Sequence, residues 1–174
     1  MVKEIPLTNS PTVALVSDED YEALSRFKSW MLDNRGYVIR KKHICRDPIT
    51  KVKKTSIIQV HREIMGFPEG TLIDHISRVK TDNRRENLRL ATNKQNQQNR
   101  GKQRNNTSGY KGVGIRKKLN KYIAHIGVDG KRLYLGIFDC PKEAAVTYNK
   151  AGLKYHDFPC LNEIEEDLLF FSRK

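Results

Sequence analysis

The chain has 174 residues, of which 37% are hydrophobic, and a formal net charge of +13. This length allows one domain or two small ones, and the lack of a long apolar run excludes a signal peptide and a bilayer-spanning helix. Cys45, Cys140 and Cys160 are scattered singly, which excludes a disulfide framework and a zinc knuckle, so we expect a soluble, cytoplasmic protein without zinc.

The N-terminal part alternates short strand patterns with turn residues. Asp47-Pro48 marks a turn between two strand patterns, and an acidic first turn after Ser17 is typical of a helix start. In chain order, the predicted elements are a strand over Thr12–Val16, a helix capped by Ser17, strands over Gly36–Ile44 and Thr55–Val60, and a short helix over His61–Met65.

A strand–strand–helix pattern comes next. Leu72–His75 and Leu88–Ala91 can pair as short strands, and Thr92 is a natural N-cap for a helix that carries Asn93–Arg100. The segment Gly101–Gly109 that follows has no apolar residue, so we predict a linker there.

The C-terminal part predicts a three-stranded antiparallel sheet with a helix behind it. Asp129-Gly130 is a strong hairpin signal between two of the strands, and Pro141 is typical of a first helical turn. The predicted strands are Val113–Arg116, Tyr122–Val128 and Arg132–Phe138, and the apolar helix face is Ala144, Ala145, Tyr148 and Ala151.

The positive charge is unevenly distributed. From Asn87 to Val128 the chain has no acidic residue, whereas a solvated surface normally mixes both signs. No amphipathic helix rich in Leu, Trp and Phe accompanies this segment, which argues against a membrane surface. Nucleic acid is therefore the favoured partner.

Asp74 and His75 stand together at the end of a predicted strand. Such a pair is often an ordinary polar turn. It can also be chemical, because a carboxylate is a hard ligand for magnesium or manganese and an imidazole can take a proton from water. The following helix offers a second oxygen ligand, Asn96, so a metal site is an alternative to the polar turn.

The residues VHREIMG, DHI and DNRRENLRLAT, followed by a further Asn, resemble the zinc-free HNH homing-type endonucleases. The resemblance implies a ββα-metal (His-Me finger) unit that cuts DNA with one divalent ion, Mg or Mn. Asp74 and Asn96 would be the metal ligands and His75 the general base. Asn87 would support the catalytic loop by hydrogen bonds, and His61 would serve packing or substrate contact.

This resemblance implies hydrolysis of a phosphodiester that leaves a 5′-phosphate and a 3′-hydroxyl. It also implies a bacterial or phage-infected cell as the setting. The family commonly has a glycine where this chain has Arg78, so we expect a different loop shape. The nearby Arg84, Arg85 and Arg89 are candidates for contacts with the DNA backbone, or for a solvated face.

The open face of the predicted C-terminal sheet is basic. Alternation places Arg116, His125, Arg132 and Tyr134 there, with Lys111 and Lys118 nearby. The segments SGYKGV, KYIAHI and YLGIFDCPKEAAVTYNKAGLKYH resemble the Apetala/ethylene-response-factor type of DNA-binding domain. The resemblance implies that this sheet lies in the major groove of DNA. Gly114 and Gly127 replace usual contact positions, so the target sequence differs from that of plant members.

Together these features predict an α+β protein that cuts double-stranded DNA with site preference, as a monomer or homodimer. The predicted domains are a nuclease domain over 1–100 with its ββα-metal core at about 70–100, a basic linker over 101–109, a DNA-binding domain over 110–162 and a tail over 163–174. The alternatives are a catalytically inactive, sequence-specific DNA-binding protein and a structural RNA binder, which would show more aromatic residues on its sheet.

Overall fold

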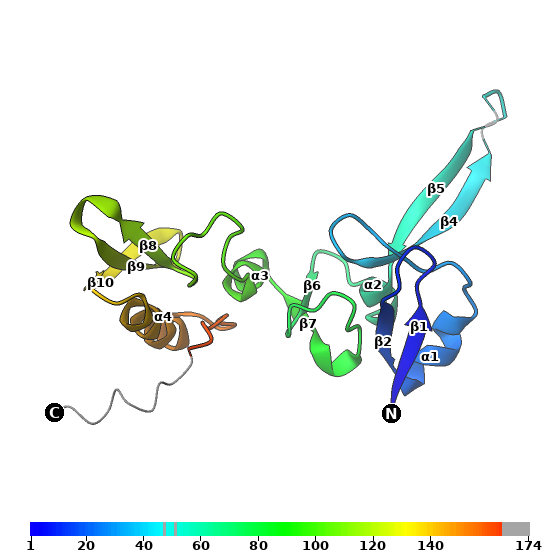
Figure 1. The fold of residues 1–174 in the computed structure, drawn as a ribbon. Coiled ribbons are helices and arrows are strands. Elements are labelled where there is room, and N and C mark those ends of the chain that lie inside the picture. Colours follow the sequence, from blue (N-terminus) through cyan, green and yellow to red (C-terminus); the bar gives the residue numbers. More distant parts are fainter. Residues whose placement is uncertain (47, 51, 165–174) are drawn as a thin grey trace. The chain divides into compact units, whose positions relative to one another are not determined.

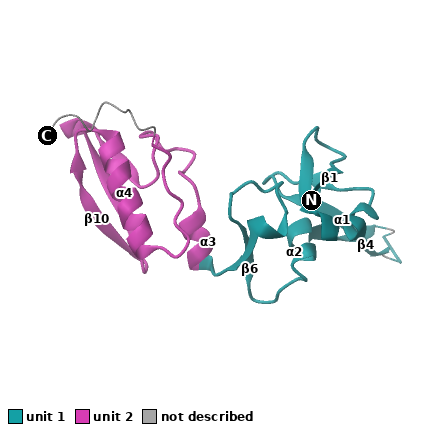
Figure 2. Cartoon of the chain, turned by 90° about the horizontal axis from the view of Figure 1, so that it is seen from below, with its two compact units in different colours: residues 1–93 teal, residues 94–174 magenta. Residues whose placement is uncertain are grey.

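The computed structural model describes residues 1–46, 48–50 and 52–164. It forms two compact units, Met1–Asn93 and Lys94–Lys174, which Figure 2 shows in different colours. The predicted α+β class is confirmed, because both units combine small antiparallel sheets with helices. Within the described residues, no helix is both long enough and apolar enough to cross a membrane.

The N-terminal unit contains small antiparallel sheets and two short α-helices (Figure 1). β1 pairs with β2, β4 pairs with both β3 and β5, and β6 pairs with β7. The elements are β1 (Val2–Pro6), β2 (Val13–Ser17), α1 (Asp18–Ser25), β3 (Met31–Leu32), β4 (Val38–Arg46), β5 (Lys53–Gln59), α2 (Val60–Ile64), β6 (Leu72–His75), the 3-10 turn η1 (Arg85–Asn87) and β7 (Leu88–Ala91).

An apolar core holds the N-terminal unit together around Trp30, which is 1% exposed. Alternation in β2 turns Ala14 and Val16 into this core, where Val38 of β4 and Val60 of α2 join them. The strands β6 and β7 have the predicted bounds, whereas β1 and β3 were not predicted from the sequence. Burying these side chains stabilises the unit by roughly 1.5–3 kcal/mol for each large one.

The C-terminal unit has a three-stranded antiparallel sheet in the order β10-β9-β8, with α4 packed on it. Asp129 and Gly130 both have positive φ, at 49° and 77°, as a two-residue hairpin turn requires. The elements are α3 (Asn93–Asn99), β8 (Val113–Arg116), the 3-10 turn η2 (Lys117–Leu119), β9 (Lys121–Val128), β10 (Lys131–Phe138) and α4 (Pro141–Tyr155).

The core of the C-terminal unit lies between α4 and the sheet. The predicted apolar face of α4 is buried against Val113, Ala124 and Ile126 of the sheet. Gly112 lies directly under Tyr148, because a Cβ at this position would come within 2.0 Å of the tyrosine ring. The small residues of this core thus set how closely helix and sheet approach.

The predicted linker has defined contacts inside the C-terminal unit. Asn106 Nδ2 donates to the carbonyl of Tyr110 at 2.9 Å, and Ser108 Oγ donates to that of Val113 at 2.7 Å. The compact units divide earlier, after Asn93 and within α3. The domain boundaries at 100 and 109 stay a prediction, and most of the predicted tail (165–174) lies outside the described residues.

Candidate active site

Asp74 and His75 are the last two residues of β6 and are 7% and 4% exposed. In the register with β7, Asp74 lies opposite Arg89 and His75 lies opposite Leu88. Because successive side chains of a strand point to opposite faces, the two residues reach different partners. The site therefore consists of a carboxylate side and an imidazole side.

On the carboxylate side, Arg89 compensates the charge of Asp74. Arg89 Nη2 and Nε donate to Oδ2 of Asp74 at 2.8 and 3.0 Å. A buried carboxylate needs such a partner, since an uncompensated charge at this depth costs several kcal/mol. A divalent cation at Asp74 would therefore share or replace the charge of Arg89.

On the imidazole side, Asn83 determines which nitrogen of the neutral His75 ring carries the proton. Asn83 is fully buried, and its Nδ2 donates to the carbonyls of Lys80 and Thr81 at 3.3 and 3.1 Å. Its Oδ1 then faces Nε2 of His75 at 3.2 Å and can only accept. The neutral ring must therefore carry its proton on Nε2, so that Nδ1 is the nitrogen with the lone pair.

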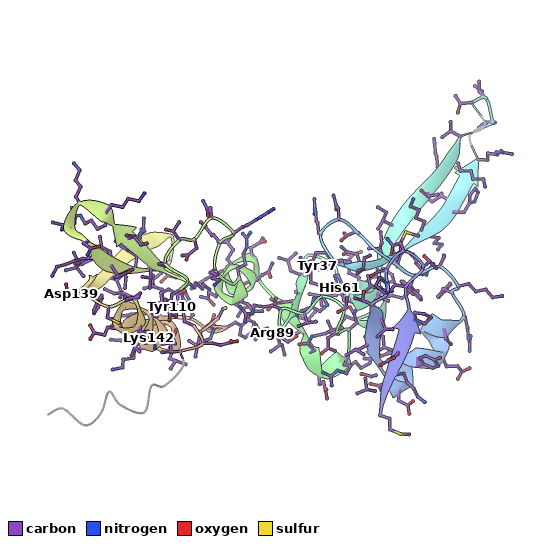
Figure 3. All side chains as sticks on the ribbon, viewed as in Figure 1. Tyr37, His61, Arg89, Tyr110, Asp139 and Lys142 are labelled. Atoms are coloured by element: carbon purple, nitrogen blue, oxygen red, sulfur yellow. The ribbon has the colours of Figure 1, made fainter. Side chains whose placement is uncertain are left out.

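Two aromatic rings pack beside His75. The ring of His61 in α2 lies 5.1 Å from that of His75, edge to face, and Tyr37 lies 5.4 Å from His61 (Figure 3). Burial, followed by the electrostatic effects of the His75 ring and of the Arg62 cation, lowers the pKa of His61 to about 4. Burial also lowers the pKa of His75, against the hydrogen bond that its Nε2 donates to Asn83, which raises it. Both rings are thus neutral near pH 7.

The loop after β6 is held by Asn87. Its Oδ1 accepts the amide of Ser77 at 2.8 Å, and its Nδ2 donates to the carbonyl of Asp82 at 2.7 Å. Both contacts join Asn87 to the loop, and its role in catalysis stays a prediction. Within this loop Arg78 has a φ of 67°, in the left-handed region that glycine adopts without strain.

The same loop is attached to the first elements of the chain. Asn83 N donates to the carbonyl of Leu15 at 2.7 Å, and Leu15 N donates to that of Thr81 at 2.8 Å. The side chain of Ser17, predicted to cap α1, accepts the amide of Arg85 and makes no capping bond. The role of Asn83 was not predicted from the sequence, where its place next to Asp82 in the motif is a local signal.

The three arginines of the N-terminal unit that were predicted to contact DNA all form ion pairs within that unit. Beside the Asp74–Arg89 pair, Arg84 contacts Asp82 at 2.7 Å and holds the pKa of that carboxyl below its usual range. Arg85 contacts the buried Asp20 at 2.7 Å. Phosphate contact at these positions stays a prediction, and it would require each guanidinium to share or leave its carboxylate.

The predicted second metal ligand, Asn96, lies in the middle of α3 and is half-buried. This part of α3 belongs to the C-terminal unit, so the pairing of Asp74 with Asn96 stays a prediction. Among the described residues, no group of three or more His, Cys, Asp or Glu is placed to hold a metal ion. By their chemistry, one carboxylate and one amide oxygen would suit magnesium, which keeps water and phosphate oxygens as further ligands.

The open face of the C-terminal sheet brings three of the predicted residues together. Tyr134 lies opposite His125 in the register, and their ring centroids are 5.5 Å apart. Arg132 Nη2 donates to Nδ1 of His125 at 3.4 Å. Partial burial and the nearby Arg132 lower the pKa of His125. The result is an exposed cluster of one guanidinium and two flat rings.

The other predicted cations of this unit differ in their surroundings. Arg116 at the end of β8 and Lys118 in η2 are exposed. Lys111 is half-buried, and its Nζ donates to the backbone carbonyl of Gln98 at 2.6 Å. Arg116 and Lys118 thus point to solvent, whereas Lys111 helps to tie α3 to the rest of the unit.

Comparisons with known proteins identify part of the chain. Residues 62–98 match the HNH endonuclease family. The chain is also 33% identical over 70 residues to APETALA2-like protein 2 of Oryza sativa, in both the indica and japonica subspecies. This match covers 37% of the chain and 16% of each relative, so the chain spans a small part of these curated relatives. No solved structure matches.

Proposed function

We propose that the chain is a metal-dependent, homing-type DNA endonuclease with site preference. The observation that carries this proposal is the arrangement of Asp74, His75, Asn83 and Asn87 inside the segment that matches the HNH endonucleases. An ordinary surface turn does not need a buried imidazole whose Nε2 proton is fixed by a hydrogen bond, nor a loop held by side-chain hydrogen bonds. A positioned general base requires this arrangement.

In the proposed reaction, His75 takes a proton from a water that attacks the scissile phosphorus in line. The Nε2–H···Oδ1 contact with Asn83 leaves Nδ1 to accept that proton and stabilises the imidazolium that forms. Asn87 holds the loop that carries these groups. A divalent ion held by Asp74 and Asn96 would supply positive charge to the scissile phosphate and its leaving oxygen.

The C-terminal sheet is proposed to hold duplex DNA. Arg116 and Arg132 are exposed on its open face, and Tyr134 is 56% exposed beside His125. An arginine can bond guanine in the major groove, and an aromatic ring can pack on a thymine methyl. The resemblance to the Apetala type of DNA-binding domain supports this assignment, as do the curated relatives of that name.

Cutting of supercoiled plasmid tests the nuclease proposal. The wild type should cut with magnesium or manganese and not with EDTA. His75→Gln keeps an amide donor for Asn83 but has no base, so we expect its rate to fall by about 10²–10⁴-fold. Fluorescence of Trp30, the sole and buried tryptophan, checks that the variant is folded. Intact plasmid with the wild type, or equal cutting by His75→Gln, would contradict the mechanism.

The same assay also tests the second candidate function, that of a catalytically inactive, sequence-specific DNA-binding protein. Wild-type chain that retards a duplex in a gel but never cuts it, with either metal, would favour that candidate. The ratio of nicked to linear product also separates single-strand from double-strand cutting. One chain has one site, so linear product would need a homodimer or two independent events.

A further inference from the structure

The strands β4 and β5 form a hairpin that extends beyond the other elements of the N-terminal unit (Figure 1). From Lys41 to Arg46 every residue is exposed, and so are Lys53, Lys54 and Thr55 on the returning strand. Most of this ribbon therefore adds nothing to the core. A two-stranded ribbon without a packed face is marginally stable, so a structural reason for its length is absent.

The ribbon is strongly basic. Its exposed cations are Lys41, Lys42, Arg46, Lys53 and Lys54, with His43 between them. Neither strand contains an acidic residue. None of Lys41, Lys42 and Lys53 forms an ion pair with a described residue. This contrasts with Arg84, Arg85 and Arg89 of the same unit, which are all paired with carboxylates.

The register adds to the repulsion. Arg46 lies directly opposite Lys53, and like charges at opposed positions of an antiparallel pair destabilise it. Lys41 lies opposite the exposed Ile57, so a cation and an apolar side chain are neighbours across the two strands. An anionic surface along the ribbon would compensate the charges of Lys41, Lys42 and Lys53.

The base of the ribbon is anchored. Arg40 Nη2 and Nε donate to the carboxylate of Glu63 in α2 at 2.7 and 3.1 Å, and its guanidinium lies 3.7 Å from the ring centre of Phe27. Val38 and Ile39 are buried at the same end. Arg40 is thus structural, and it presents the outer cations from a held base, which lowers the entropic cost of binding.

We propose that the β4–β5 ribbon is a DNA-contacting element of the N-terminal unit, which inserts along a groove of the duplex and holds it for cutting. The major groove of B-DNA is about 12 Å wide and admits a two-stranded β-ribbon. This inference rests on the proposed function, because it takes duplex DNA as the substrate. It adds a basic surface that lies in a different unit from the C-terminal sheet.

Lysines on an exposed ribbon also oppose edge-to-edge association, so the test must separate the two roles. Lys41→Glu, Lys42→Glu and Lys53→Glu keep a charge at the edge but repel phosphate. We expect each to weaken binding of a mixed-sequence DNA duplex in EDTA by about tenfold, and to leave the chain monodisperse. Lys28→Glu reverses the charge of an exposed residue outside the two ribbon strands; it is the matched control and should change affinity less than twofold.

The salt dependence gives a second readout. With Lys41, Lys42 and Lys53 all changed to Gln, the slope of log affinity against log salt should fall by about 2–3, since each phosphate contact contributes about 0.9. Lys28→Gln should leave the slope unchanged. Equal slopes for the triple variant and the wild type would overturn the proposal, as would ribbon variants that aggregate but bind normally.

Cys45 allows a direct test, because it is an exposed thiol on the ribbon. A photoactivatable azidophenacyl group on Cys45, in a Cys140→Ser background, should cross-link to the duplex. The same group on Lys28→Cys with Cys45→Ser should not. If the wild type binds no duplex at all, the proposed function fails as well. If it binds and cuts while Cys45 gives no cross-link, only the ribbon proposal is wrong.

Discussion

The two units of this chain use their charged side chains in different ways. In the N-terminal unit outside the ribbon, Arg84, Arg85 and Arg89 are bound to carboxylates, and imidazole and amide groups are buried beside them. In the C-terminal unit the sheet–helix core is apolar, and Arg116 and Arg132 lie on an exposed sheet face.

Net charge alone therefore does not locate a nucleic-acid surface. A cation paired with a buried carboxylate is part of the fold, and its loss leaves an unpaired charge behind. A cation on an open face has only water and counterions to lose when phosphate arrives. The candidate active site belongs to the first kind of region, and the proposed binding surfaces belong to the second.

The largest expected effect is on the C-terminal core. Gly112→Ala puts a Cβ against the buried ring of Tyr148 at a φ of 75°, so we expect a loss of about 3 kcal/mol or more in unfolding free energy. Gly114→Ala, which meets nothing within 4 Å, is the control. Far-UV circular dichroism should show an earlier transition for Gly112→Ala alone. If Trp30 fluorescence shifted equally, the two units would not unfold separately.

The polar interior of the N-terminal unit should make it acid-sensitive. His61 has a pKa of about 4 when folded against 6.5 when unfolded, and it faces His75, Arg62, Asp33 and Tyr37. The unfolded chain therefore binds more protons below pH 6.5, and about 3 kcal/mol of stability is lost between pH 6.5 and 4. Denaturant unfolding followed by Trp30 fluorescence measures this. His61→Phe, which cannot titrate, should flatten the dependence, and an unchanged slope would refute it.

A third effect separates positioning from packing in the candidate site. Asn83→Leu removes the acceptor for Nε2 of His75, so we expect plasmid cutting to fall by about 10²-fold. The direct readout is the ¹⁵N chemical shift of the His75 ring, which should report a proton on Nε2 in the wild type and a mixture of tautomers in the variant. A variant that stays folded and keeps the Nε2–H form would show that Asn83 does not select the tautomer.

A fourth prediction compares paired and exposed arginines directly. Arg132→Ala should weaken binding of duplex DNA by about 1–3 kcal/mol and leave stability nearly unchanged. Arg85→Ala should do the reverse, with about 1 kcal/mol lost from stability because Asp20 is left unpaired. Fluorescence anisotropy with a labelled duplex and thermal unfolding measure the two quantities. Equal losses of affinity in both variants would remove the distinction between the units.

The smallest expected effect concerns the loop of the candidate site. Arg78 has a left-handed backbone that costs a non-glycine residue about 1 kcal/mol, so Arg78→Gly should recover up to that amount. Thermal unfolding measures the gain. Ser77→Gly, at the preceding position, is the control and should destabilise the chain slightly. A loss of stability in Arg78→Gly would mean that the arginine side chain contributes more than its backbone costs.

Local signals predicted the C-terminal unit well. Asp129-Gly130 set the hairpin, Pro141 opened α4 at the predicted residue, and the apolar face of that helix is buried as expected. These features depend on residues a few positions apart, so the sequence carries them in full. The strands β1 and β3 were missed because each depends on pairing with a segment that local patterns do not reveal.

In the candidate active site, too, some features were predicted from local sequence and others depend on remote contacts. The spacing of Asp74, His75 and Asn87 was legible in the sequence, and so was the resemblance to HNH endonucleases in a segment that the family comparison matches. The role of Asn83 was not, because it follows from Lys80 and Thr81 taking both of its amide protons. The orientation of a side-chain amide depends on the groups around it in the folded protein, so no sequence pattern predicts it.

The sequence by itself determined the class of the fold, the elements around the Asp-His pair and the excess of positive charge. The tertiary structure decided which positive charges are compensated. Arg85 meets Asp20, a residue 65 positions away, and Arg40 meets Glu63 across 23 positions. Such pairs form only where packing brings remote segments together, since propensity and periodicity act over a few residues. Lys41, Lys42 and Lys53 of the β4–β5 ribbon and Arg116 and Arg132 of the C-terminal sheet remain exposed for the same reason: among the described residues, no packed segment carries a carboxylate to them.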